Sequence, residues 1–146
     1  MTETDAWLLG VHLWATAAMM GLIWFVQLVH YPLFAEVGRS RFVGYEHQHT
    51  RRTSWVVGPL MAIEGVAAVT LFVWPAAELG RALPFVAGLV LVLVHLSTVM
   101  LQVPAHRRLA SGFDAEIHHR LVATNWIRTA GWTTRAGLAT AMLAAA

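Results

Sequence analysis

Four long apolar stretches divide this chain of 146 residues and leave it few ways to fold. A helix needs about 20 apolar residues to cross the hydrocarbon core of a bilayer, and each stretch is long enough. None has the clean polar face of a helix that packs on a water-soluble protein. We therefore predict an all-α fold, an integral membrane four-helix bundle formed by a single domain over residues 1–146. The stretches run over Trp7–Phe34, Trp55–Trp74, Leu83–Val103 and Leu121–Ala146.

The arginines are spread unevenly over the connections that join these stretches. Seven of the ten lie in the first and third connections, and the second connection holds only Arg81. Positively charged residues favour the cytoplasmic side of a membrane helix. The sequence therefore predicts that the first and third connections are cytoplasmic and that both termini are external, in a bacterial inner membrane. The seven arginines are Arg39, Arg41, Arg51, Arg52, Arg107, Arg108 and Arg120.

Composition supports the membrane class and excludes some chemistry. The chain is 58% hydrophobic and 12% charged, whereas soluble domains carry about 25% charged residues. The basic balance comes from arginines in connections, which fits lipid headgroups better than nucleic acid. The chain has no cysteine, which excludes disulfides, thiolate ligands and cysteine nucleophiles.

Local signals refine the expected helices. The first connection, Glu36–Thr53, contains no proline, and we expect it to form a helix that lies at the membrane surface and leads into the second helix. The third helix should end at Val103-Pro104, because proline removes a backbone donor. Asp114 is placed to cap the fourth helix. Gly131 and Gly137 should allow that helix to pack closely against its neighbours.

Three polar residues lie deep in the predicted spans. Counted from the inner boundary, Glu64 and His95 lie about 13 Å and 12 Å into helices 2 and 3. Arg128 is about 10 Å into helix 4. Each is costly to bury alone, so we predict that the three are in contact. Glu64 and His95 are candidate catalytic residues that relay protons, and Arg128 with Asn125 would bind a substrate oxygen. The alternative is that these groups only fix helix packing.

The two cytoplasmic connections each contain Glu-x-x-His, as Glu46…His49 and Glu116…His119. In di-iron four-helix proteins, two such pairs hold metal. Ligands of nitrogen and oxygen without sulfur suit iron, copper, zinc or manganese. Haem is the less favoured cofactor, because His95 is level with no helix 1 histidine. The alternative is that these residues form a hydrated helix face at the membrane interface, where they pair with arginines. The predicted metal ligands are His30, Glu46, His49, His106 and His119.

Short segments resemble known families of small four-helix membrane proteins. His12-Leu13-Trp14, followed by Gly21 and Trp24, is similar to the first helix of copper-resistance D-type domains and of membrane-bound, haem-containing protoporphyrinogen oxidase. The segment Val103–Leu109, followed by Asn125–Arg128 and Arg135, resembles the anthrone-oxygenase-like family. That resemblance implies a membrane fold with redox activity and a role for His106, Trp126 and Arg128, although His106 stands at or beside the family's asparagine.

These observations lead to one expected function and two alternatives. The leading hypothesis is a membrane-bound, metal-dependent oxidoreductase or oxygenase that acts on an amphipathic small molecule at a site open to the cytoplasm. The first alternative is a haem- or metal-handling protein or a transporter, which would need to form a homo-oligomer. The second is a structural membrane subunit whose polar groups satisfy one another. The lipid bilayer is the expected partner in every case.

Overall fold

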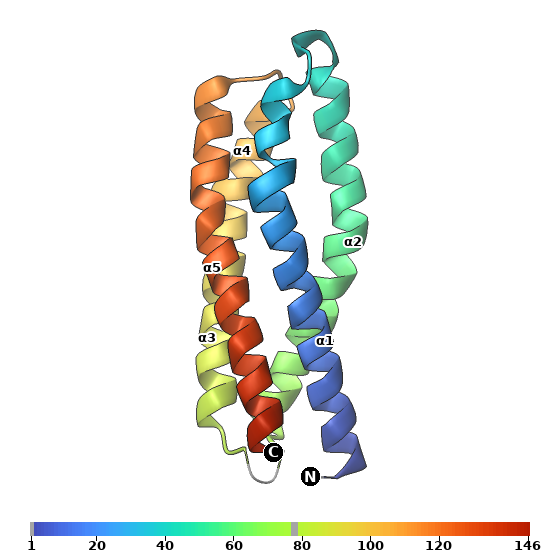
Figure 1. Cartoon of the computed structure of the whole chain (residues 1–146), viewed down its shortest axis with the longest axis vertical. Coiled ribbons are helices and arrows are strands. Elements are labelled where there is room, and N and C mark those ends of the chain that lie inside the picture. The colour runs from blue at the N-terminus through green and yellow to red at the C-terminus, as the bar shows by residue number, and fades with distance from the viewer. Residues whose placement is uncertain (1, 77–78) are drawn as a thin grey trace.

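The structure is a computed structural model that describes residues 2–76 and 79–146, and every regular element in these residues is a helix. The helices form four rods packed side by side (Figure 1). The first rod is α1 (Glu3–Phe25), η1 (a π-helix, Val26–His30) and η2 (a 3-10 helix, Pro32–Glu36). The second is α2 (Arg39–Val73). The third is α3 (Ala82–Ser97), η3 (a π-helix, Thr98–Gln102) and α4 (Val103–Leu109), and the fourth is α5 (Ala115–Ala145).

Both arginine-rich connections lie at one end of the bundle, opposite the two chain ends (Figure 1). Three rods are long and apolar enough to cross a membrane: Glu3–Glu36, Arg39–Val73 and Ala82–Leu109. The fourth rod, α5, is long enough but more polar, because it carries Asn125, Arg128 and Arg135. All three side chains are buried inside the bundle, so α5 turns its polar groups toward the other helices.

The first connection is shorter than expected. The segment Glu36–Thr53 was predicted to form a helix that lies at the membrane surface and leads into the second helix. It is helical from Arg39 and does lead into the second helix, but it does not lie apart from it, because α2 begins at Arg39 and runs without a break to Val73 (Figure 1). Phe42, Glu46 and His49 are spaced by four and three residues and are all buried. This spacing places them on one face of a helix. That face packs inward, so the polar half of α2 extends the bundle.

Two π-helical turns interrupt the first and third rods, and each is followed two residues later by a proline. η1 precedes Pro32, and η3 precedes Pro104. The prediction that the third helix ends at Val103-Pro104 was wrong, because α4 continues to Leu109. A proline in the first turn of a helix breaks no hydrogen bond of that helix, because the backbone N–H groups of the first turn have no partner within the helix. In both rods the wider π turn comes just before the proline. Both rods therefore carry side chains past their prolines to the same end of the bundle.

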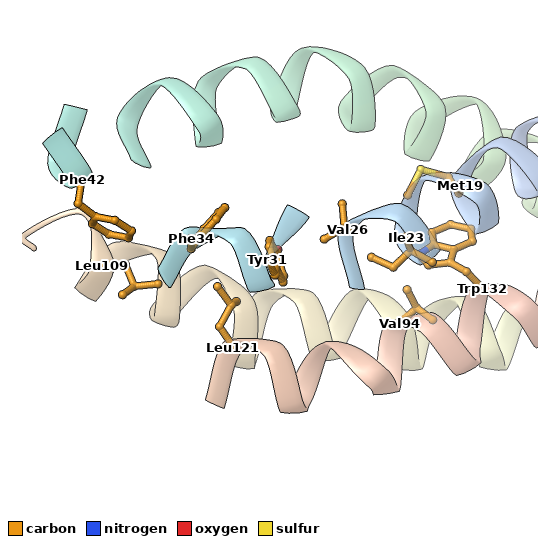
Figure 2. Packing of buried hydrophobic residues seen from close by; sticks show 10 residues of the cluster. All are labelled: Met19, Ile23, Val26, Tyr31, Phe34, Phe42, Val94, Leu109, Leu121 and Trp132. Atoms are coloured by element: carbon orange, nitrogen blue, oxygen red, sulfur yellow. The ribbon is translucent and has the colours of Figure 1, made fainter. Parts of the chain in front are cut away.

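The interior contains two hydrophobic clusters, and α3 and α5 pack closely against each other. Figure 2 shows the main hydrophobic cluster, in which Trp132, Val94 and Ile23 lie together between the rods. A Cβ atom at Gly131 would collide with the Val94 side chain, which confirms the close approach predicted there. Nothing lies within 4 Å of the equivalent position at Gly137. Asp114 caps α5 as expected, accepting from the amides of Glu116 and Ile117.

Candidate functional site

A cluster of titratable side chains lies at the end of the bundle that carries the arginine-rich connections. We call it the histidine cluster, and its members are His30, Tyr31, Glu46, His49 and His106. Three rods supply it: η1 and the residue after it, the inward face of α2, and α4. Glu46 is fully buried, and Tyr31 and His49 are also buried. The π-helical turns and their prolines bring the first and third rods to this level.

Glu46, His106 and Tyr31 form a continuous chain of hydrogen bonds. Nδ1 of His106 lies 2.6 Å from Oε1 of Glu46, and Nε2 of His106 lies 2.9 Å from the Tyr31 hydroxyl. With Glu46 ionised, the carboxylate can only accept, so His106 donates from Nδ1 and its Nε2 accepts from the Tyr31 hydroxyl. A carboxylate that orients a histidine, which in turn accepts from a hydroxyl, is the arrangement that activates an oxygen for acid–base or nucleophilic chemistry.

A pair of histidines lies beside this chain. Nε2 of His30 is 2.7 Å from Nδ1 of His49, which also lies 3.2 Å from the Thr53 hydroxyl. One imidazole must donate and the other accept, so a single hydrogen joins the two rings. The ring centroids of His49 and His106 are 5.2 Å apart. The two hydrogen-bonded pairs therefore form one compact group.

The histidine cluster opens onto a cavity of about 570 Å³ between the first three rods. Tyr31, His49 and His106 line its polar end, and Arg128 reaches it from α5. Apolar surface makes up most of the remaining wall, which includes Leu22, Ile23, Val26, Val57, Met61 and Val103. The polar side chains there include Gln102 and a second arginine, Arg107. Cavities of this size and character hold small organic molecules, with a few polar groups fixing their orientation.

Arg128 is held in the cavity wall by a buried polar network. Its Nη1 donates to Oδ1 of Asn125 over 3.0 Å, and the Asn125 amide donates to Oε1 of Gln27 over 2.9 Å. Arg128 is 6% exposed, and its Nε has no hydrogen-bond partner in the described residues. The guanidinium also lies beside the Tyr31 phenol. Of the two residues predicted to bind substrate, Arg128 lines this cavity, whereas Asn125 does not line it but bonds to Arg128.

Four of the five predicted metal ligands meet in the histidine cluster: His30, Glu46, His49 and His106. His119 does not, because it is exposed on α5; its neighbour His118 instead points inward and donates to the Tyr31 carbonyl over 2.7 Å. Residues 2–76 and 79–146 contain no group of three or more histidine or acidic side chains arranged to hold a metal ion. The donor atoms are bonded in pairs and do not converge on one point, so the arrangement does not fit a metal as it stands.

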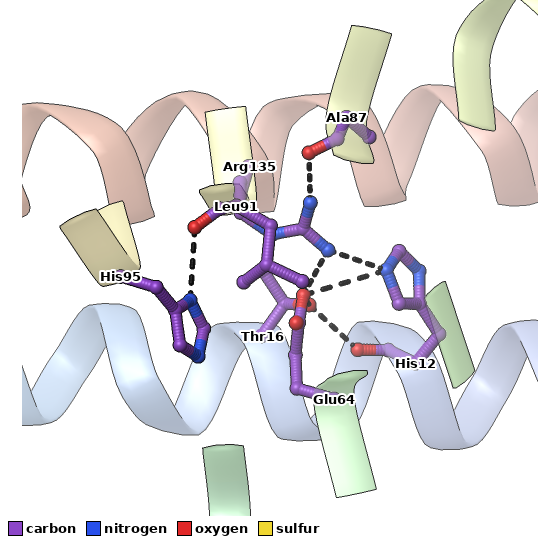
Figure 3. Close-up of polar contacts among 7 residues, drawn as sticks. All are labelled: His12, Thr16, Glu64, Ala87, Leu91, His95 and Arg135. Carbon is purple, nitrogen blue, oxygen red and sulfur yellow. Dashed lines mark hydrogen bonds and ion pairs between the residues drawn. The ribbon is translucent and has the colours of Figure 1, made fainter. Parts of the chain in front are cut away.

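The predicted contact of Glu64 with Arg128 and His95 was wrong. The arginine that pairs with Glu64 is Arg135, two turns further along α5, and the nearby histidine is His12 (Figure 3). His95 is half-buried and donates from Nδ1 to the Leu91 carbonyl over 2.8 Å. The prediction placed Trp55 and Leu121, the first residues of the second and fourth apolar stretches, at the same depth in the membrane. The pairing of Glu64 with Arg135 instead implies that the two residues are offset along the bundle by about five residues, or about 8 Å of helix.

The Glu64–Arg135 ion pair ties all four rods together in the half of the bundle nearer the chain ends. Arg135 donates to Glu64 of α2 and to the Ala87 carbonyl of α3 (Figure 3). It also lies 3.0 Å from Nε2 of His12 on α1. Since arginine can only donate, Nε2 of His12 accepts and the ring carries its hydrogen on Nδ1. Thr16 donates to Glu64 over 3.1 Å. Glu64 and Arg135 are both 0% exposed and neither lines the cavity, so this group acts on the bundle and not on a ligand.

Sequence reasoning missed Tyr31 and the partner role of Arg135. A spacing signal was available for Arg135. The buried positions of α5 include Leu121, Asn125, Arg128, Trp132 and Arg135, which alternate by four and three residues. That pattern marks one inward stripe and includes both arginines. No comparable signal marks Tyr31, because its position follows a π-helical turn.

No protein-family model, curated protein or solved structure matches this chain.

Proposed function

We propose that this chain is an integral membrane protein whose four rods all cross the bilayer, with the histidine cluster on the cytoplasmic side and both termini outside. Its surface supports this, because many large apolar side chains are exposed while Glu64, Arg135 and Asn125 are buried. A surface that is apolar around a polar interior suits lipid as the solvent.

Exposed tryptophans support a particular position in the bilayer. Trp55 of α2 and Trp74, the residue that follows α2, are 79% and 71% exposed. They are 19 positions apart in sequence, which corresponds to about 28 Å of helix. Trp7 and Trp24 on α1 are exposed as well, about 26 Å apart. These lengths approach the hydrocarbon thickness of about 30 Å, and tryptophan favours its two boundaries. This position puts the apolar part of the cavity in the hydrocarbon layer and the histidine cluster beyond its cytoplasmic boundary, at the level of the headgroups.

Reporter fusions test this orientation. A reporter inserted after Arg81 or fused after Ala146 should read as external, and one inserted after Gly112 should read as cytoplasmic. The reverse pattern would overturn the orientation, and uniform cytoplasmic signals at all three sites would overturn membrane insertion.

Within this membrane protein, we propose that the cavity binds an amphipathic small molecule through an oxygen atom and removes a proton from that molecule, so that negative charge develops on the bound oxygen. The observation that carries the proposal is the Tyr31 hydroxyl in the cavity wall, backed by His106 and the buried Glu46. Tyr31 would pass its hydrogen to Nε2 of His106, and Glu46 would stabilise the resulting imidazolium. The tyrosinate would then accept the proton of the bound molecule.

Arg128 gives the proposed reaction its second component. Removing a proton from an enol, a phenol or a carbon next to a carbonyl leaves negative charge on an oxygen. A guanidinium fixed in a largely apolar cavity stabilises such a charge without having to reorganise.

Ligand binding can be tested with two aromatic probes of matched shape, naphthoate and naphthamide. Detergent-purified protein should bind the anion at least about tenfold more tightly, because only the anion gains a charge-assisted hydrogen bond from Arg128. Arg128→Gln should remove that preference, and Arg120→Gln, on the same helix but outside the cavity, should keep it. Equal binding of both probes by the parent protein would contradict the proposal.

A metal-dependent oxidoreductase is the second candidate. It is favoured by one observation, namely that four residues predicted as ligands from sequence lie within a single cluster. The pairs would have to rotate apart for three donors to face one ion. The metal content of the purified protein tests this candidate directly.

A further inference from the structure

A second, shallow groove lies on the outside of the bundle, where η3 and α4 meet α5. Its volume is about 130 Å³. The first wall comprises Met100, Leu101, Pro104, Ala105 and Arg108, and the second comprises Ile117, Arg120 and Thr124. None of these eight residues lines the cavity beside the histidine cluster, so the groove is a separate feature.

The groove carries two positive charges and no negative one. Arg108 and Arg120 are both exposed and come from opposite walls. Neither arginine forms an ion pair with a carboxylate in the described residues. Glu116 is one helical turn from Arg120, yet it does not pair with it. Two free guanidiniums on either side of one groove form a site for an anion with several oxygens, such as a phosphate.

The surface below the arginines is apolar. Leu101, Ala105 and Ile117 contribute to the groove itself. Further along the third rod toward the chain ends, Met100, Leu96 and Leu93 are 68%, 49% and 61% exposed. On α5, Ile127 is 51% exposed. The charged end of the groove thus continues into an apolar surface as long as several helical turns.

We propose that this groove binds an anionic phospholipid, with its phosphate between Arg108 and Arg120 and its acyl chains along the apolar surface. The proposal rests on the membrane orientation inferred above. In that orientation Arg120 lies six residues, about 9 Å, beyond Trp126 toward the cytoplasm, at the level of the headgroups. Basic grooves between membrane helices on the cytoplasmic side suit anionic headgroups. A free phosphate would use the arginines but not the apolar surface.

Native mass spectrometry of the detergent-purified chain tests this site. Phosphatidylglycerol and phosphatidylcholine with the same acyl chains are titrated against the parent protein and against Arg108→Gln/Arg120→Gln. An arginine near the headgroups contributes about fivefold in affinity, so the double variant should bind phosphatidylglycerol about 25-fold more weakly. Binding of phosphatidylcholine should change little. Arg39→Gln/Arg41→Gln, which removes the same charge at the same end of the bundle, is the matched control and should bind like the parent.

Three results would overturn the site: equal losses in the control, no preference for phosphatidylglycerol in the parent, or full displacement of the lipid by millimolar inorganic phosphate. If the double variant aggregates, each single variant should still show about a fivefold loss. A chain that purifies from the soluble fraction without detergent would refute the membrane proposal itself. A detergent-dependent chain with no lipid preference would refute only the lipid site.

Discussion

His106 and Glu46 are separated by 60 residues in the chain, yet Nδ1 of the histidine lies 2.6 Å from a carboxylate oxygen that is fully buried. The contact joins α2 to α4 at the polar end of the cavity. It fixes the direction in which the His106 ring faces, and therefore the nitrogen that it offers to Tyr31. Replacing Glu46 by Gln would retain an oxygen acceptor but lose the charge that stabilises an imidazolium. We expect Glu46→Gln to bind naphthoate like the parent while losing proton-transfer activity.

The Glu64–Arg135 pair should be the most sensitive polar contact in the bundle. Removing one member of a buried ion pair leaves the other uncompensated, which typically costs about 3–5 kcal/mol. Glu64→Ala and Arg135→Ala should each lower the free energy of unfolding by about that much. Glu64→Leu/Arg135→Met should cost less than the sum, because it buries no single charge. Denaturation in mild detergent, followed by circular dichroism, measures these values.

Arg51→Ala is the control for the ion-pair series, because Arg51 is exposed and makes no ion pair in the described residues. Its effect should be within about 0.5 kcal/mol. An Arg135→Ala protein as stable as this control would show that the ion pair does not hold the rods together.

The contact between Gly131 and Val94 gives a prediction about packing. Gly131→Ala should destabilise the bundle by about 1–3 kcal/mol, since the added methyl group overlaps the valine unless α3 and α5 move apart. Gly137→Ala, at an open position six residues further on, should be neutral or slightly stabilising. Thermal unfolding of both variants makes the comparison. Equal melting temperatures would contradict the close approach of α3 and α5.

The paired arrangement of the histidine cluster predicts its metal content. Protein purified without added metal should contain far less than one equivalent of iron, copper, zinc or manganese by elemental analysis. His49→Ala should not change that content, because His49 is joined to His30 by a hydrogen bond. One equivalent of a single metal in the parent, lost in His49→Ala, would favour the metal-dependent oxidoreductase over proton transfer.

Much of the fold follows from the sequence. The apolar stretches predicted four helices, and their termini and connections lie at the expected ends of the bundle (Figure 1). Asp114 and Gly131 act as their residue types indicate. The polar half of α2 was misassigned because a helix that carries Arg39 and Arg52 looks like a surface segment. Its inward stripe of Phe42, Glu46 and His49 decides the structure instead.

The site was only partly predictable. Glu-x-x-His and isolated polar residues pointed to Glu46, His49, His106 and Arg128, and these residues do gather around one cavity. The pairing of histidine nitrogens with oxygens in the histidine cluster depends on the two π-helical turns. A π-helical turn contains one more residue than an α-helical turn, and no simple sequence pattern predicts where it occurs. The predicted depth of Glu64 led to the wrong partner. A shift of about five residues between α2 and α5 is enough to bring Arg135 to Glu64 in place of Arg128.

Hydrogen–deuterium exchange tests the proposed proton transfer most directly. The probe is β-tetralone in deuterium oxide, an amphipathic ketone with an acidic C–H next to its carbonyl. Purified protein should exchange that hydrogen faster than buffer and detergent alone, as measured by mass spectrometry. Tyr31→Phe should be at least about 100-fold slower, the usual contribution of a positioned acid–base group, while it still binds naphthoate. Exchange by Tyr31→Phe at the parent rate would contradict the account.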